Sequence, residues 1–318
     1  MKPLAQNLDR RSKHSPRAQS RKAVPATPQP LVTFTSDFGH EDWFVGVVHG
    51  VVHEICPPAR IVDLTHAIPP GDVGRASFVL EAACPDFPPG TVHLAVVDPG
   101  VGTARHALAV RARGQLFVGP DNGILEWALS DPDAEVRALT EDHWFRHPVS
   151  RTFHGRDVFA PVAAHLACGR PLESFGPALA DPVRAPRPAV RALDGGLAGC
   201  VVFVDRFGNA LTNLTAEALA AAFRGVPEET IVVRIGSRSI RGLARSYGDA
   251  PIGTLLAIVG SSGRLEIAQV GGNAATRFGF GEASPRPLRA PPARKHGAPA
   301  RFRTGAPRVA RRLRTPLG

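Results

Sequence analysis

The chain has 318 residues, of which 43% are apolar and 21% charged, so it can bury a core and is not a wholly disordered protein. Its formal charge of +10 would suggest a nucleic-acid partner. However, residues 1–30 and 284–318 hold 17 of the 38 Lys and Arg and one of the 28 acidic residues. The body between them keeps 21 cations against 27 acids, a net charge of −6. We therefore do not expect nucleic acid to be the main partner.

The sequence also argues against a membrane or exported protein. It contains no run of about 20 apolar residues, the length that a membrane-spanning helix needs. The pair Arg10-Arg11 resembles a twin-arginine signal, but no apolar segment follows it. The cysteines are widely spaced and form no C-x-x-C pair, so we expect reduced thiols in a cytoplasmic protein. They are Cys56, Cys84, Cys168 and Cys200.

Strands and helices alternate in the first half of the chain. The tails, residues 1–30 and 284–318, lack apolar periodicity and are predicted to be disordered. Apolar runs predict strands, and helical spacing of apolar residues predicts helices between them. This alternation indicates an α/β domain over residues 31–186, with a central sheet flanked by helices. The predicted strands are 31–35, 60–64, 91–97, 107–112 and 115–118, and the helices are 42–55, 73–84 and 157–168.

The second half has a different pattern. Pro-rich residues 182–190 are predicted to be a linker. Beyond them short β runs dominate, which indicates a smaller β-rich domain over residues 191–283. The predicted strands are 199–204, 230–235, 255–259 and 265–270, with one helix at 216–223.

Polar residues cluster where predicted strands end. Asp37, Asp98, Asp121 and Asn122 all stand at such ends, where α/β sheets bind ligands. Asp, Asn and Gly also make ordinary turns, and for any single position the two interpretations have about equal weight. Several strand-end carboxylates beside glycines favour a site, because glycine lets the backbone approach a ligand closely.

Three other patterns are rejected. Asp37-Phe38-Gly39 matches a protein-kinase tripeptide, but no Gly-rich loop or His-Arg-Asp loop accompanies it. The phosphate-binding sequence G-x-x-x-x-G-K-[ST] does not occur. His49 and His53 have the i, i+4 spacing of a zinc pair, but solvated or structural histidines are the favoured interpretation. No metal is expected.

His154 gains weight from its possible neighbours. It precedes a predicted helix, and it could meet Asp98 and Arg105 in space. At this point six segments together resemble the S-adenosylmethionine (SAM) hydroxide adenosyltransferases, relatives of the fluorinases and chlorinases. The resemblance covers about residues 31–283. The segments are Thr35-Ser36-Asp37-Phe38-Gly39, Asp98-Pro99-Gly100-Val101-Gly102-Thr103-Ala104-Arg105, Gly119-Pro120-Asp121-Asn122-Gly123, Phe153-His154-Gly155-Arg156-Asp157, Asp205-Arg206-Phe207-Gly208-Asn209 and Gly272-Asn273-Ala274-Ala275.

The resemblance implies hydrolysis of SAM to adenosine and L-methionine, with SAM as substrate and no further cofactor. It implies an α/β domain, a smaller β-barrel-like domain, and homotrimers whose sites lie between subunits. It also implies residue roles. The water-activating triad maps onto Asp98, Arg105 and His154, and the carboxylate that binds the ribose hydroxyls maps onto Asp37. The residues that hold the methionine and adenine portions map onto Asp205 and Asn209. The adenine edge would be read around Asn273 and Ala274, and the methionine carboxylate would be bound near Ser261 and Ser262. Asp121 and Asn122 join the predicted substrate contacts as strand-end residues.

Two alternatives stay open. The halogenase branch has tyrosines at the positions of Asp98 and His154, a serine at Gly155, and an inserted loop that this chain lacks. A 5′-halogenase is therefore the weaker reading within the family. The second alternative is a SAM-sensing or nucleic-acid-associated protein that uses its basic tails.

Overall fold

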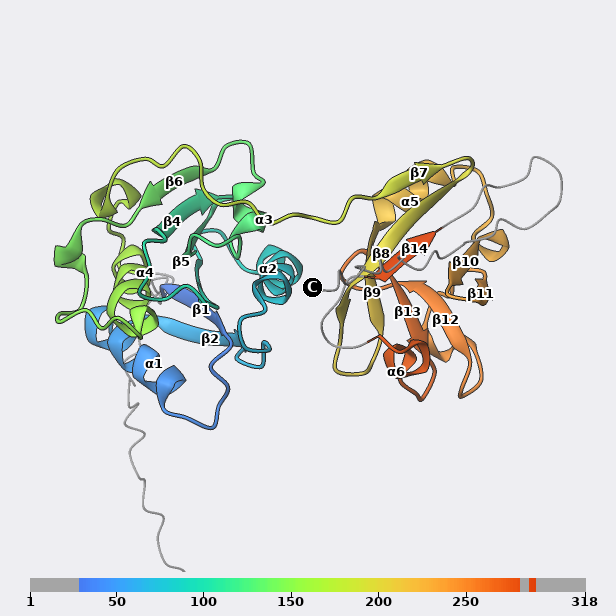
Figure 1. Ribbon diagram of the computed structural model, residues 1–318, viewed down its shortest axis with the longest axis horizontal. Helices are drawn as coiled ribbons and strands as arrows, with labels where there is room; N and C mark the ends of the chain where they lie inside the picture. Colours follow the sequence, from blue (N-terminus) through green and yellow to red (C-terminus); the bar gives the residue numbers. More distant parts are fainter. Residues whose placement is uncertain (1–28, 281–285, 290–318) are drawn as a thin grey trace, which may run out of the picture.

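The computed structural model describes residues 29–280 and 286–289, which form two domains joined by an extended linker (Figure 1). The predictions of disorder for residues 1–28 and 290–318 lie outside the described residues. Residues 183–190 have no regular secondary structure, as the Pro-rich sequence predicts. Within the described part of the chain, no helix is long and apolar enough to cross a membrane.

The N-terminal domain is built on a six-stranded sheet with the order β2-β1-β3-β5-β4-β6. Strands β2, β1, β3 and β5 run parallel, and β4 pairs antiparallel with both β5 and β6. The chain leaves β1 toward β2 on one side and returns to β3 on the other, so a topological switch point lies between β1 and β3. The strands are β1 (Leu31–Ser36), β2 (Arg60–Thr65), β3 (Val92–Val96), β4 (Ala107–Ala112), β5 (Gln115–Pro120) and β6 (Glu135–Ala138).

Helices cover both faces of this sheet, as expected for an α/β domain. On one face, α1 (Phe44–Ile55) and α4 (Ala160–Ala167) bury Val48 and Val162 against Phe34 of β1. On the other face, α2 (Val73–Ala83) and α3 (Glu126–Leu129) enclose a second core with Phe117 of β5. The apolar side chains of β3 alternate between the two cores, because successive residues of a strand point to opposite faces. The predicted α/β architecture is confirmed.

The C-terminal domain is an antiparallel sheet with the order β11-β10-β14-β8-β9-β13-β12, and β7 pairs with β8. A bridge between Ala244 and Ile258 brings its two edges together, which gives the barrel-like form that was expected. The strand β14 is a correction, since it lies in a segment that we predicted to be disordered. The elements are β7 (Arg191–Leu193), β8 (Gly196–Val204), β9 (Ala210–Thr215), α5 (Ala216–Ala222), β10 (Val232–Ile235), β11 (Arg238–Arg241), β12 (Leu255–Val259), β13 (Arg264–Gln269), α6 (Ala274–Phe278) and β14 (Arg286–Arg289).

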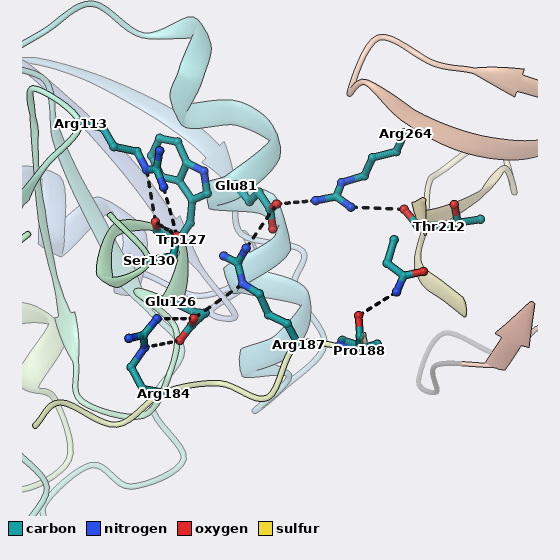
Figure 2. Close-up of polar contacts among 11 residues, drawn as sticks. Glu81, Arg113, Glu126, Trp127, Ser130, Arg184, Arg187, Pro188, Thr212 and Arg264 are labelled. Carbon is teal, nitrogen blue, oxygen red and sulfur yellow. Dashed lines mark hydrogen bonds and ion pairs between the residues drawn. The ribbon is translucent and has the colours of Figure 1, made fainter. Parts of the chain in front are cut away.

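Ion pairs connect the two domains through α2 and the linker (Figure 2). Glu81 of α2 pairs with Arg264 of β13 and with Arg187 of the linker. Arg187 Nε also lies 3.7 Å from Glu126 Oε1 of α3. The same oxygen forms an ion pair with Arg184 Nη2 at 2.7 Å. We call these five side chains the interdomain ion-pair chain. Together with the stacked rings of Phe78 and Phe203, it holds the C-terminal domain against α2.

One sequence expectation about the cysteines is wrong. Cys56, directly after α1, forms a disulfide with Cys168, directly after α4, and their Cα atoms are 5.8 Å apart. The two helices pack side by side on the sheet, which brings residues 112 positions apart into contact. Cys84 and Cys200 are free and buried, as expected for inert thiols, and burial raises the pKa of Cys84 to about 12.

Candidate active site

The carboxylates of Asp37 and Asp98 follow the two strands that flank the switch point, β1 and β3. Asp37 Oδ2 accepts a hydrogen bond of 2.8 Å from the backbone of Gly71. Gly71 in turn packs against Pro99, the residue after Asp98: a Cβ added to this glycine would lie 3.8 Å from the proline Cβ. The two strand ends therefore share one neighbour at this edge of the sheet.

The three predicted catalytic side chains are in direct contact. Arg105 donates from Nε to Asp98 Oδ1 at 3.0 Å, and its terminal nitrogen Nη2 donates to Oδ2. The same Nη2 lies 2.9 Å from His154 Nδ1. Both members of the ion pair are shielded, with 5% of the Asp98 side chain and 11% of the Arg105 side chain exposed. Arg105 thus bridges an acid and a histidine that stand 56 residues apart.

This geometry fixes the tautomer of the histidine. A guanidinium can only donate, so His154 Nδ1 must accept, and the proton of the neutral ring is on Nε2. Burial and the nearby Arg105 charge lower the pKa of His154 below its ordinary value of 6.5. The ring is therefore neutral at pH 7 and offers an N–H donor from Nε2.

Glycine shapes the loop that carries Asp98 and Arg105. Gly102 has a φ of +77°, and a Cβ at this position would lie 2.4 Å from the carbonyl oxygen of Arg151. Thr103 Oγ1 closes the turn by donating to Gly100 O at 2.7 Å. Because no side chain fits at Gly102, this loop packs directly on the segment that precedes His154.

The segment that carries His154 is anchored by a residue that the sequence did not single out. Asp157 is fully buried in the π-helical turn Gly155–Phe159, a local geometry often found at functional sites. Its carboxylate accepts from Arg156 Nε at 2.6 Å and from the backbone of Ser150 at 2.8 Å. The Arg-Asp order within the fourth motif was the available signal. Asp157 holds the loop before His154 in place.

Asp121 and Asn122 are used within the protein. Asn122 Nδ2 donates to Val97 O at 2.8 Å, one residue before Asp98. Asp121, which is buried, accepts at 2.7 Å from the backbone of Val183 at the start of the linker. These contacts give both side chains a positioning role, and a direct contact with substrate stays a prediction.

The predicted C-terminal residues Asp205 and Asn209 form a tight turn between β8 and β9. Asp205 Oδ1 accepts from the backbone of Phe207 at 2.9 Å and of Asn209 at 2.8 Å, and Oδ2 accepts from Asn209 Nδ2 at 2.9 Å. The tip residue, Phe207, is 77% exposed. Phe207 lies within the fifth motif, but its exposure could not be read from the motif, because only the fold shows which side chains are left uncovered.

Asn273 belongs to the same cluster. It caps α6 by accepting from the backbone of Thr276 at 2.7 Å. Gly208 lies directly against it, so close that a Cβ there would be 2.1 Å from the Asn273 side chain. The Asp205 turn and Asn273 are therefore neighbours, as predicted. The side chain of Ala274 is fully buried in the domain core, so only its backbone can face a ligand.

Ser261 and Ser262 lie in the turn between β12 and β13. Ser262 Oγ is buried and has no hydrogen-bond partner among the described residues. The turn packs on Glu266, whose Oε1 would be 1.8 Å from a Cβ at Gly260. Burial, together with the Asp205 charge, raises the pKa of Glu266, and Tyr247 donates to it at 2.8 Å. Neither Glu266 nor Tyr247 was predicted from the sequence.

The predicted residues thus form two groups. The first group contains Asp37, Asp98, Arg105 and His154, and the second lies around Asp205 and Asn273. Within residues 29–280 no hydrogen bond or ion pair joins one group to the other. A cavity of about 590 Å³ does lie between α2 and β8, but it is lined by residues such as Arg75, Phe78 and Phe203 and by none of the predicted site residues.

Comparisons with known proteins match both domains to one family. Residues 32–176 match the SAM hydroxide adenosyltransferase N-terminal domain, and residues 199–286 match its C-terminal domain. A crystal structure of a conserved protein from Thermotoga maritima is similar, with a TM-score of 0.75 and 39% identity. That match covers 80% of this chain and 98% of the Thermotoga chain.

Two named relatives separate the branches of the family. The (R)-S-adenosyl-L-methionine hydrolase of Salinispora arenicola is 46% identical over 77% of this chain and 92% of its own length. A fluorinase from an Actinoplanes species is 29% identical over 77% of this chain and 93% of its own length. With both domain types matched in register and the Asp98–Arg105–His154 contacts in place, the chain belongs to the SAM hydroxide adenosyltransferase family.

Proposed function

We propose that this protein is a SAM hydrolase, which converts SAM to adenosine and L-methionine by attack of water at C5′. The contact of Arg105 with both Asp98 and His154 is the observation that carries the proposal. The bond between the water oxygen and C5′ forms while the bond from C5′ to the sulfonium breaks, and the electron pair stays on sulfur. Methionine leaves as a neutral thioether, so the leaving group needs no acid.

The triad then has one task, which is to hold and deprotonate the water. Asp98 accepts a hydrogen bond from the water and takes its proton. His154 donates from Nε2 to the water oxygen and directs its second lone pair toward C5′. Arg105 holds both groups and keeps the carboxylate oxygens at fixed positions. Asp37 accepts from the ribose hydroxyls and so fixes C5′ against the water.

The hydrolase relatives are named for the R form of S-adenosyl-L-methionine. Since "L" already describes the methionine α-carbon, R refers to the sulfonium centre. We extend this preference to the present chain because the hydrolase relatives are 44–46% identical to it. The cytoplasm is the proposed compartment because no apolar segment follows Arg10-Arg11, although the Cys56–Cys168 disulfide removes the argument from reduced thiols.

We also propose that the two residue groups meet between subunits of a homotrimer. The support is that they are separate within one chain and that the Phe207 ring is left exposed beside the second group. The test mixes two inactive variants, Asp98→Ala and Asp205→Asn, unfolds them together and refolds them. In a randomly assembled cyclic trimer, about one quarter of the sites take the first residue group from an Asp205→Asn chain and the second group from an Asp98→Ala chain. These sites have both groups intact, so they should be active. Sites confined to one chain would restore no activity.

The function itself is tested by incubating the purified protein with each sulfonium epimer of SAM and separating the products by chromatography. Adenosine and methionine from the R epimer, with solvent ¹⁸O in the new 5′ hydroxyl, are expected. The halogenase alternative requires a 5′-halide product when fluoride or chloride is added. It is disfavoured because the hydrolase relatives are 44–46% identical to this chain, whereas the fluorinase is 29% identical.

A further inference from the structure

We propose that His49, Asp63 and His66 form a binding site for a divalent transition metal of the zinc type. His49 comes from α1, Asp63 from β2 and His66 from the residue after β2, and α1 and β2 lie side by side (Figure 1). One nitrogen from each histidine and one carboxylate oxygen all lie within 4.8 Å of one another. The proposal is independent of the proposed hydrolase function.

The distances between ligand atoms suit a metal. His49 Nε2 lies 2.9 Å from Asp63 Oδ1, and His66 Nε2 lies 3.1 Å from the same oxygen. A tetrahedral zinc with ligand bonds of about 2.0–2.1 Å separates its ligands by about 3.3 Å. The two carboxylate–imidazole distances, 2.9 and 3.1 Å, are thus within a few tenths of an ångström of the required value.

A buried nitrogen at the centre is the second observation. The His66 side chain is fully buried, and the one polar atom recorded near its Nε2 among the described residues is Asp63 Oδ1 at 3.1 Å, a contact whose alignment is poor for a hydrogen bond although it still acts on the pKa of both groups. A buried imidazole nitrogen without such a bond is unusual, because the lost hydrogen bond costs free energy. In a metal complex this nitrogen would donate its lone pair to the ion.

The groups around His66 are of the kind that orient a metal-binding histidine. His66 Nδ1 lies 2.7 Å from Ser36 Oγ, which also accepts from the backbone of Phe38. With Nδ1–H donating to this oxygen, the Nε2 lone pair is free for a metal. The Phe34 ring packs against His66 with the ring centroids 4.6 Å apart and limits its rotation.

A metal could enter from solvent and complete its coordination there. The side chains of His49 and Asp63 are 30% and 31% exposed, so one side of the cluster is open. Water can supply the remaining ligands from this open side. Two imidazoles and one carboxylate favour zinc, cobalt or nickel over magnesium or calcium.

The sequence spacing pointed to the wrong pair. His49 and His53 stand one helical turn apart, but His53 is exposed and belongs to no metal-type cluster among the described residues. His53 therefore serves as the matched control, since it lies on the same helix and has the same chemistry. The competing explanation is a purely hydrogen-bonded cluster, in which both imidazoles donate to Asp63 and no metal binds.

The experiment uses the full chain after treatment with a chelator. Zinc is titrated by calorimetry, and cobalt by its visible absorption, into the wild type, His49→Ala and His53→Ala. One equivalent is expected to bind to the wild type and to His53→Ala. His49→Ala should bind at least about tenfold more weakly, since even outer partners of a metal ligand cost that much.

Melting of the same proteins provides a readout that does not depend on spectroscopy. Zinc should raise the melting temperature of the wild type and of His53→Ala, and raise that of His49→Ala by clearly less at the same zinc concentration. His49 is half-buried on the helix surface, so its removal should leave the fold intact, which the metal-free melting curves check. No binding to the wild type, or equal binding to His49→Ala, overturns the proposal and supports the hydrogen-bonded cluster.

Discussion

Replacing Asp98 by asparagine tests the triad most directly. The shape is kept, but only one acceptor oxygen remains where Arg105 now donates to both. The new amide nitrogen would face a guanidinium donor, and the attacking water would lose its proton acceptor. General-base catalysis is worth about 10²–10⁴ in rate, which corresponds to about 3–5 kcal/mol of activation free energy. We expect kcat to fall by that factor.

The contact geometry also predicts how the effect combines with a second change. Arg105→Met removes the group that positions Asp98 and His154, so both variants damage one unit. The double variant should then lose about as much activity as Asp98→Asn alone, rather than the product of the two losses. The assay is single-turnover formation of adenosine at saturating SAM. Multiplicative losses, or a kcat for Asp98→Asn within threefold of the wild type, would refute the reasoning.

Three further predictions concern stability. His93 is fully buried, and burial lowers its pKa to about 4 in the folded protein. In the unfolded chain the same imidazole takes up its proton near pH 6.5. The free energy of unfolding should therefore fall by about 3 kcal/mol as the pH is lowered from 6.5 to 4. Urea denaturation at several pH values in this range measures how the free energy of unfolding changes with pH. The same pH dependence in His93→Gln would contradict this prediction. Gly102→Ala should lower stability and activity more than Gly90→Ala does. Both glycines have a positive φ, but only at Gly102 would the new Cβ lie 2.4 Å from a carbonyl oxygen, that of Arg151. Similar melting curves for the two variants would count against this. Breaking the Cys56–Cys168 disulfide, which closes a span of 112 residues, should cost about 5 kcal/mol in a Cys56→Ser variant. Cys84→Ser is the buried-thiol control. Identical thermal melts of wild type and Cys56→Ser would exclude that contribution.

The sequence was sufficient for the α/β domain because its signals are local. Continuous apolar runs marked β1 and β3, and helical spacing of valines marked α1. The ends of these strands pointed to Asp37 and Asp98 as candidate site residues. The six family motifs supplied the other candidate site residues, including Arg105 and His154. The structure shows that Arg105 contacts both Asp98 and His154.

The sequence failed where pairing over long distance decides the outcome. Cys56 and Cys168 pair because two helices pack side by side, which no spacing reveals. Strand β14 forms because β8 offers it an open edge, although its own composition is that of a basic tail. His49 meets Asp63 rather than His53, since the partner comes from the neighbouring strand. Each of these contacts depends on the fold as a whole.

The interdomain ion-pair chain has a consequence for solution conditions. Its central members are partly open to water, with 24% of the Glu81 side chain and 42% of the Arg187 side chain exposed. Attraction between such groups weakens as ionic strength rises, because the Debye length shrinks to about 3 Å at 1 M salt. The angle between the domains is therefore set in part by an interaction that dissolved ions compete for. Small-angle scattering at low and high salt reports that angle directly.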